Sequence, residues 1–180
     1  MTLDLRRLDA AAFDAAVPDL AVILADAVAG GASVGFLLPF SPVDAATWWR
    51  SLESDVAQGN VLVIVARLDG RVVGTAQLRL AQLPNARHRA EVAKVLVHRS
   101  ARRQGIATAL MREIERIAVA DGRTLLVLDT IADSEAEPLY MKLGWTRAAE
   151  IPRYAGMPDG ELRPTVIFYR DLSVKERGTG

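Results

Sequence analysis

Hydrophobic positions along the chain recur with two periods, one typical of helices and one typical of strands. Residues 3–8 predict an edge strand. A helical spacing of three and four residues then joins Leu20, Ile23, Leu24, Ala27 and Val28. Pro18 fits the first turn of this helix, and Gly30 with Gly31 fits its end. The chain is therefore expected to open with a strand followed by a helix.

A second helix is predicted after a Gly-rich, apolar loop at residues 30–40. Ser41 and Pro42 followed by Asp44 form a helix-start signature, and Gly59 ends the pattern. The apolar stripe of this helix consists of Ala45, Trp48, Trp49, Leu52 and Val56. Two helices are therefore expected to flank the loop.

The rest of the chain alternates strands with helices. Residues 60–68 and 71–80 are rich in Val, Ile and Leu, and Asp69 followed by Gly70 predicts a type I′ hairpin between them. Further strands are predicted at residues 90–98, 125–128, 146–151 and 165–171, with helices at residues 106–120 and around residues 137–143. This α/β pattern shows no repeat or linker, so it predicts one domain over residues 1–172 and a polar tail over residues 173–180.

Composition and charge restrict the function classes. A chain of 180 residues with 51% hydrophobic and 24% charged residues is ordinary for one globular domain. The 22 Lys and Arg balance the 22 Asp and Glu, so there is no overall positive field for nucleic acid or an anionic membrane. No segment has the form of a signal peptide or a membrane span. The absence of cysteine suits the cytoplasm and excludes a cysteine nucleophile.

The segment Arg102, Arg103, Gln104, Gly105, Ile106 and Ala107 stands between a predicted strand and a strong amphipathic helix. The first amides of a helix lack internal partners and carry the positive end of the helix dipole. Gly105 has no Cβ, which lets an anion approach the backbone closely, and a diphosphate suits such a turn. The alternative is that the arginines are simply solvated and that Gly105 serves only the turn. Phosphate-loop and dinucleotide-binding motifs are both missing.

Here the sequence resembles the GNAT superfamily of N-acetyltransferases. Its acyl-coenzyme A motif, R/Q-x-x-G-x-G/A, is matched by Arg102, Gly105 and Ala107. A second motif of the superfamily is matched by Ala136, Leu139, Tyr140, Lys142, Leu143, Gly144 and Trp145. The resemblance implies a mixed central sheet with splayed middle strands, flanked by helices. Within the superfamily, residues 30–36, 90–98 and 125–130 look like the tabtoxin-resistance type.

The resemblance also implies a site for acetyl-coenzyme A as cosubstrate. The pantetheine arm is expected between strands 90–98 and 125–130, against the backbone of Val95, Leu96 and Val97. The diphosphate is expected on the amides from Arg103 to Ala107. Asp133 stands where many members carry an asparagine that contacts the cofactor, so the sequence departs from the family pattern there.

Three side chains are candidates for acid–base chemistry. An alkylammonium has a pKa near 10.4, so a base must deprotonate the acceptor amine, and Glu91 and Asp129 are the candidates. Tyr140 is the candidate acid for the departing thiolate. The structural alternatives are a solvated Glu91, a turn-forming Asp129 and a core Tyr140. The family resemblance favours the catalytic roles.

The loop between the first two helices shapes substrate choice in this superfamily, so Phe36, Leu37 and Leu38 are expected to line the acceptor pocket. His88 and His98 lack the spacing of metal ligands, and no metal is expected. The leading hypothesis is an acetyl-coenzyme A dependent N-acetyltransferase that acts on a small amine as a monomer or homodimer. The subfamily resemblance suggests an amino-acid-like toxin or antibiotic as this amine. The alternatives are a protein N-terminal or lysine acetyltransferase and a non-catalytic acyl-coenzyme A-binding module.

Overall fold

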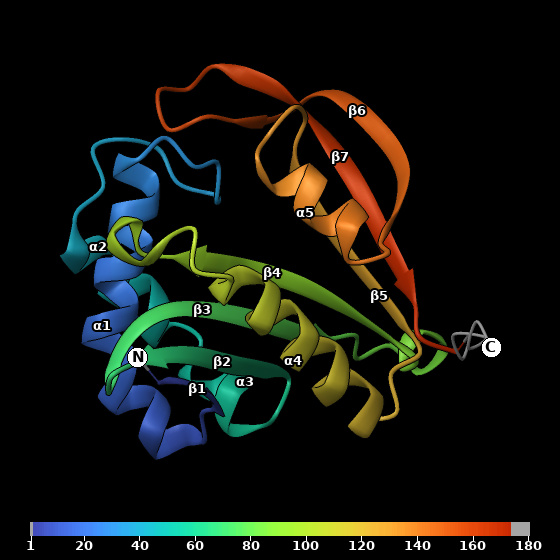
Figure 1. Cartoon of the computed structure of the whole chain (residues 1–180), viewed down its shortest axis with the longest axis horizontal. Helices are drawn as coiled ribbons and strands as arrows, with labels where there is room; N and C mark the ends of the chain where they lie inside the picture. The colour runs from blue at the N-terminus through green and yellow to red at the C-terminus, as the bar shows by residue number, and fades with distance from the viewer. Residues whose placement is uncertain (1, 174–180) are drawn as a thin grey trace.

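The computed structural model describes residues 2–173 as one mixed sheet with helices on both faces (Figure 1). The strand order is β1-β2-β3-β4-β5-β7-β6, and only the β4–β5 pair is parallel. The strands are β1 (Leu3–Arg7), β2 (Val61–Leu68), β3 (Arg71–Leu80), β4 (Arg89–Val97), β5 (Leu125–Ile131), β6 (Thr146–Gly156) and β7 (Leu162–Asp171). The helices are α1 (Ala10–Ala29), α2 (Pro42–Arg50), α3 (Glu53–Ala57), α4 (Ile106–Ala120) and α5 (Ala136–Lys142). All but Ser173 of the predicted polar tail lies outside the described residues.

The predicted fold class is confirmed, including the hairpin between β2 and β3. Leu68 pairs with Arg71, and the two turn residues between them, Asp69 and Gly70, both have positive φ, at 49° and 84°. A type I′ turn requires this conformation at both positions. The β1 strand lies at the sheet edge, as the sequence predicted.

Two helix boundaries differ from the prediction. The first helix begins at Ala10, where the Asp9 carboxylate accepts a hydrogen bond from the Ala12 amide, so Pro18 lies inside the helix and not in its first turn. The predicted second helix is divided into α2, which ends at Arg50, and α3, which begins at Glu53; at the break, the Ser51 hydroxyl donates to the Trp48 carbonyl. Both differences come from local hydrogen bonds that compete with the apolar periodicity.

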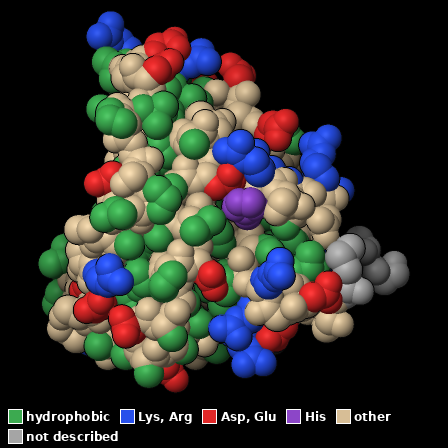
Figure 2. All heavy atoms as spheres, turned by 90° about the vertical axis from the view of Figure 1, so that its left-hand side faces the viewer, with side chains coloured by type: hydrophobic (Ala, Val, Ile, Leu, Met, Phe, Trp, Pro, Cys, Tyr) green, Lys and Arg blue, Asp and Glu red, His purple; other side chains and the backbone are tan. Residues whose placement is uncertain are grey.

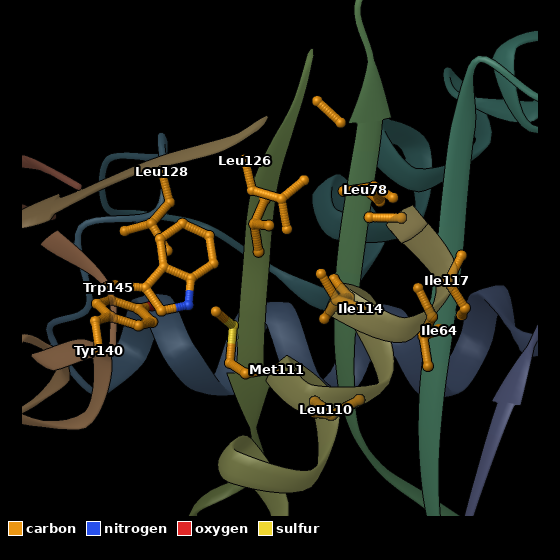
Figure 3. Close-up of a cluster of buried hydrophobic side chains, with 14 of the residues drawn as sticks. Ile64, Leu78, Leu110, Met111, Ile114, Ile117, Leu126, Leu128, Tyr140 and Trp145 are labelled. Atoms are coloured by element: carbon orange, nitrogen blue, oxygen red, sulfur yellow. The ribbon is translucent and has the colours of Figure 1, made fainter. Parts of the chain in front are cut away.

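Two apolar layers cover the sheet, one on each face. On one face, α4 packs against β2–β5, and we call this cluster the α4 layer. Its residues include Leu110, Met111, Ile114, Leu126 and Leu128 (Figure 3). On the other face, α1 and α2 pack against β2 through a second cluster, which we call the α1 layer. It includes Phe13, Leu24 and Trp49. Because strand side chains alternate between faces, the cluster to which a residue belongs shows which face it occupies.

The central strands β4 and β5 diverge. Their pairing runs from Arg89 opposite Leu125 to Glu91 opposite Val127, and no later residue of β4 pairs with β5. Figure 1 shows β4 and β5 separating from each other, with β7, β6 and α5 on the side of β5. We call this separation beyond Glu91 and Val127 the splay. It confirms the splayed middle strands expected from the sequence.

A backbone bulge in β4 lies beside the splay. Lys94 has a φ of 51°, and the pairing of β4 with β3 shifts register between Thr75 and Gln77. Before this point Ala90 and Val92 belong to the α4 layer, whereas after it Leu96 belongs to the α1 layer. One extra residue therefore exchanges the two faces of the strand.

No helix within residues 2–173 is long and apolar enough to cross a membrane. Figure 2 shows side chains of both charge signs mixed over one face of the molecule, with no continuous basic area on that face. This pattern agrees with the balanced charge of the sequence.

Candidate active site

The N-terminus of α4 presents amide groups without partners. The first backbone hydrogen bond of the helix runs from the Ala109 amide to the Gly105 carbonyl, and no side chain caps the end. By contrast, Asp9 caps α1, and Ser41 with Asp44 forms a capping box on α2. The positive end of α4 is thus left open for an anion.

The turn before α4 has the backbone shape of an anion-binding nest. Arg103 and Gly105 have φ values of 65° and 77°, and Arg102, Arg103, Gln104 and Gly105 are all exposed. A Cβ built on Gly105 would meet no atom within 4 Å, so the space in front of its backbone is open. Ile106 is buried in the α4 layer and anchors the turn to the core.

A cluster of charged residues fixes this turn to the rest of the fold. The Arg102 Nε donates to the Val97 carbonyl at 3.3 Å, which joins the turn to the end of β4. The Arg99 amide donates to the Asp26 carboxylate at 3.0 Å, and the Arg99 side chain also donates to it. Burial opposes ionisation of Asp26, but the hydrogen bonds from Arg99 outweigh it and lower the pKa of this carboxyl.

Glu91 and Asp129 lie on the two strands that form the splay. Glu91 is the last residue of β4 that pairs with β5, and Asp129 lies two residues beyond Val127, the last residue of β5 that pairs with β4. Leu126 and Leu128 belong to the α4 layer, so Asp129 projects from the opposite face of β5. Glu91 projects from the same face of β4, and the Arg79 Nη1 lies 3.7 Å from its carboxylate.

Tyr140 lies on the other face of the sheet, at the edge of the α4 layer. Its side chain is 7% exposed and packs at 6.2 Å from the Trp145 ring and 5.7 Å from the Phe168 ring, measured between centroids. Figure 3 shows it beside Trp145 and below Leu128. Burial, with a smaller effect of the Asp129 charge, raises the pKa of Tyr140 to about 12. The phenol therefore stays protonated at neutral pH.

Comparison with protein-family models decides the family. Residues 31–145 match the model of the acetyltransferase (GNAT) family. The chain belongs to the GNAT family. The matched segment contains the α4 turn, the splay and the Tyr140 motif, so the resemblance seen in the sequence is confirmed at family level.

Solved structures of GNAT-type acetyltransferases share the fold over nearly the whole chain. An N-acetyltransferase from Staphylococcus aureus Mu50 superimposes with a TM-score of 0.79 at 21% identity, covering 96% of this chain and 99% of its own. A protein from Salmonella typhimurium, assigned as an acetyltransferase and solved with its cofactor acetyl-CoA, gives 0.77 at 19% identity, covering 100% and 98%. A structure assigned as a phosphinothricin N-acetyltransferase gives 0.78 at 21% identity, covering 96% and 100%.

The structure brings a residue to the GNAT splay that sequence analysis missed. The Lys94 Nζ lies 5.0 Å from the Trp48 ring centroid and 5.7 Å from the Phe36 ring centroid. Burial, with a further contribution from Arg79, lowers the pKa of Lys94 to about 8, although Asp129 and Glu91 act in the opposite direction. The only signal for this residue in the sequence was a lysine among the hydrophobic residues of a predicted strand. The bulge that turns its side chain toward the aromatic rings was not predictable from it.

The loop at residues 30–40 contacts the tip of the β6–β7 hairpin. The Ser33 hydroxyl donates to the Gly156 carbonyl, and the Leu38 amide donates to the Pro158 carbonyl, each at 2.8 Å. Among the three predicted acceptor residues, Phe36 faces Lys94, whereas Leu37 and Leu38 are 58% and 51% exposed. Only Phe36 is therefore placed against a charged group of the splay.

Asp133, the position that departs from the GNAT pattern, lies in the turn between β5 and α5. It has a φ of 59°, and its amide donates to the Glu137 carboxylate at 2.6 Å. Glu137 is itself buried and paired with Arg147. This pairing fixes the turn that leads from the splay to Tyr140. Within residues 2–173, no three His, Asp or Glu side chains are grouped as metal ligands.

The lowered pKa of Lys94 predicts a pH-dependent stability difference between the parent and Lys94→Met. The pKa is about 8 in the folded protein and 10.5 ordinarily, so the unfolded chain holds more protons between these values. The parent should therefore gain stability relative to Lys94→Met as pH rises through this interval. Melting temperatures of both proteins at about pH 7 and about pH 9.5 test this sign. A constant difference would contradict the burial of a charged ammonium.

Proposed function

We propose that the protein is an N-acetyltransferase that moves an acetyl group from acetyl-CoA to the amine of a small molecule. The amine attacks the thioester directly while both substrates are bound, and residues 1–172 act as one catalytic domain. The observation that carries this proposal is the set of unpartnered amides at the start of α4, directly beside the open edge of β4. A diphosphate bound there places the pantetheine arm along that edge.

The open edge of β4 supports pantetheine binding by Val95, Leu96 and Val97. On one side, this part of the strand pairs with β3, where Thr75 lies opposite Leu96. On the other side, the β5 partner is absent beyond Glu91, so backbone groups remain for another hydrogen-bonding chain, although the Val97 carbonyl also accepts from Arg102. The amides of pantetheine match this requirement. The backbone from Arg103 to Ala107 and the turn containing Asp133 complete the proposed cofactor site.

The proposed reaction uses side chains from both faces of the sheet at the splay. Glu91 and Asp129 take a proton from the acceptor ammonium, directly or through water, which frees the amine lone pair. The amine nitrogen bonds to the thioester carbon to give a tetrahedral adduct. The adduct nitrogen then gives up its second proton to the same carboxylates or to water, and the carbon–sulfur bond breaks to leave the amide. Tyr140 donates its proton to the departing thiolate from the opposite face. Its pKa of about 12 keeps it protonated until the thiolate develops.

The contact between the loop at residues 30–40 and the β6–β7 tip favours a small acceptor. The two hydrogen bonds from Ser33 and Leu38 join the loop at residues 30–40 to the β6–β7 tip, which limits access for a long polypeptide. Within small amines, we propose the amino-acid-like toxins or antibiotics that the tabtoxin-resistance resemblance implies. The fold shared with the protein assigned as a phosphinothricin N-acetyltransferase is compatible with this class.

Release of free thiol from acetyl-CoA, measured against a panel of small amines and peptides, tests the proposed function. We expect acceptor-dependent release with small amines and little release with peptides. Release with peptides alone would replace the small-molecule acceptor with a protein acceptor. Coenzyme A binding without release for any acceptor would leave a non-catalytic binding module.

Removing both proposed bases should change the pH dependence of the reaction. With Glu91→Gln and Asp129→Asn combined, the acceptor amine must lose its proton to bulk solvent, and its pKa is about 10.4. The rising limb of the pH profile of kcat/KM should therefore move to higher pH. Glu150→Gln, an exposed β6 position, is the control expected to keep the parent profile. An unshifted profile in the double variant would remove both carboxylates from the base role.

A further inference from the structure

The Lys94 ammonium lies within reach of the charges of Glu91 and Asp129 but is not paired with either. Its Nζ forms no hydrogen bond or ion pair with any residue within 2–173, and its contacts are the rings of Phe36 and Trp48. Glu91, on the same strand, pairs instead with Arg79. A partly buried ammonium without an acceptor is costly, because the rings replace only part of the hydration it has lost.

A second unpartnered donor lies on the neighbouring strand. Gln77 is 0% exposed, and its Nε2 has no hydrogen-bond partner. Its Oε1 accepts a hydrogen bond from the Arg79 Nε at 3.3 Å, which leaves the amide nitrogen as the unsatisfied end. Gln77 lies opposite Ala93 in the β3–β4 register, next to the bulge at Lys94. A fully buried amide donor without a partner is rare in folded proteins.

Both donors project from the face of the sheet that carries the proposed bases. Ala76, Leu78, Ala90 and Val92 all belong to the α4 layer. Strand alternation therefore places Gln77, Arg79 and Glu91 on the opposite face. Lys94 joins them there, because the bulge directs its side chain onto Phe36 and Trp48. The face thus combines two unpaired donors with two carboxylates.

We propose that Lys94 and Gln77 form an anion subsite that binds a carboxylate of the acceptor, so that the acceptor is a molecule carrying both an amine and a carboxylate. This inference rests on the proposed acetyltransferase function and names the substrate class of the same site. The acceptor carboxylate supplies the oxygen atoms that both donors lack. The acceptor ammonium faces Glu91 and Asp129, which makes the pocket complementary to both charges of the molecule.

The charges around Lys94 give the subsite a pH dependence. Arg79 of β3 acts to lower its pKa, whereas Glu91 of β4 and Asp129 of β5 act to raise it, and burial gives a value of about 8. Above that pH the free protein loses the ammonium that binds the carboxylate. KM for carboxylate acceptors should then rise, while KM for acceptors without a carboxylate should not follow the same titration.

The test compares each α-amino acid with its primary carboxamide, which keeps the amine and the shape but removes the negative charge. For the best acceptor, we expect the parent to prefer the acid by about 10- to 100-fold in kcat/KM, mainly through KM. Lys94→Met should reduce this preference to nearly onefold, and Gln77→Leu should reduce it by about 10-fold. Lys142→Met, which removes an exposed lysine on α5, should keep the parent preference.

A binding measurement keeps the test independent of turnover and of folding failure. With coenzyme A present, N-acetyl amino acids should raise the melting temperature of the parent more than their amides do, and this difference should vanish in Lys94→Met. Equal use and equal binding of acids and amides by the parent would overturn the anion subsite while leaving the acetyltransferase intact. Coenzyme A binding with no acceptor used would overturn the proposed function and the subsite with it.

Discussion

Tyr140→Phe is expected to lower turnover by about 100- to 10,000-fold while leaving coenzyme A affinity nearly unchanged. The substitution removes one hydroxyl and keeps the ring, which packs against Trp145 and Phe168. In the proposed reaction, only the proton transfer to the departing thiolate is therefore lost. Steady-state kinetics with saturating acetyl-CoA measures the turnover, and titration with coenzyme A measures the affinity.

The raised pKa of Tyr140 affects this expectation in two ways. At about 12 the phenol is fully protonated before the reaction, but it also releases its proton less readily than an exposed phenol. In the proposed reaction the thiolate forms beside this buried phenol, so the same desolvation is expected to raise the basicity of the thiolate and to keep the transfer feasible. Tyr154→Phe, at a tyrosine that is 55% exposed, is the matched control expected to retain parent turnover. Parent-like turnover in Tyr140→Phe would assign the proton to water or another group.

Gly105→Glu is expected to weaken coenzyme A binding by about 100-fold or more. The new carboxylate enters the open space in front of the α4 amides, where it competes with the diphosphate and repels it. The left-handed backbone at this position also carries a strain of about 1 kcal/mol for any L side chain. Calorimetric titration with coenzyme A measures the affinity, and thermal unfolding measures the strain.

Gly122→Glu separates these two effects. Gly122 lies just beyond the other end of α4, has a φ of 76°, and would also meet no atom within 4 Å on gaining a Cβ. It should therefore lose similar stability but keep coenzyme A affinity. Equal binding by both variants and the parent would remove the α4 turn from the cofactor site.

Local signals in the sequence were sufficient for much of the fold. The Asp69-Gly70 turn determined the hairpin, and the spacing from Ile106 onward determined α4, because both depend on short-range geometry. The family motif at Arg102 to Ala107 pointed to the turn that the structure leaves open. Pro18 was misplaced because the Asp9 cap starts the helix earlier than the strongest apolar spacing.

Lys94 and Gln77 show what the sequence could not reveal. A lysine and a glutamine in strands ordinarily indicate solvent-facing positions. Their burial depends on the β4 bulge and on the loop at residues 30–40, which come together only in the folded sheet. Glu91 and Asp129 were predicted as bases from the family resemblance alone, and the structure places them on the two strands that separate at the splay.

A crystal structure of the protein with coenzyme A bound tests the central proposal most directly. The proposal predicts diphosphate oxygens within hydrogen-bond distance of the amides between Arg103 and Ala107, with the pantetheine arm along β4 beyond Glu91. A cofactor bound elsewhere, or an α4 turn whose amides contact only the protein's own atoms in that complex, would contradict it.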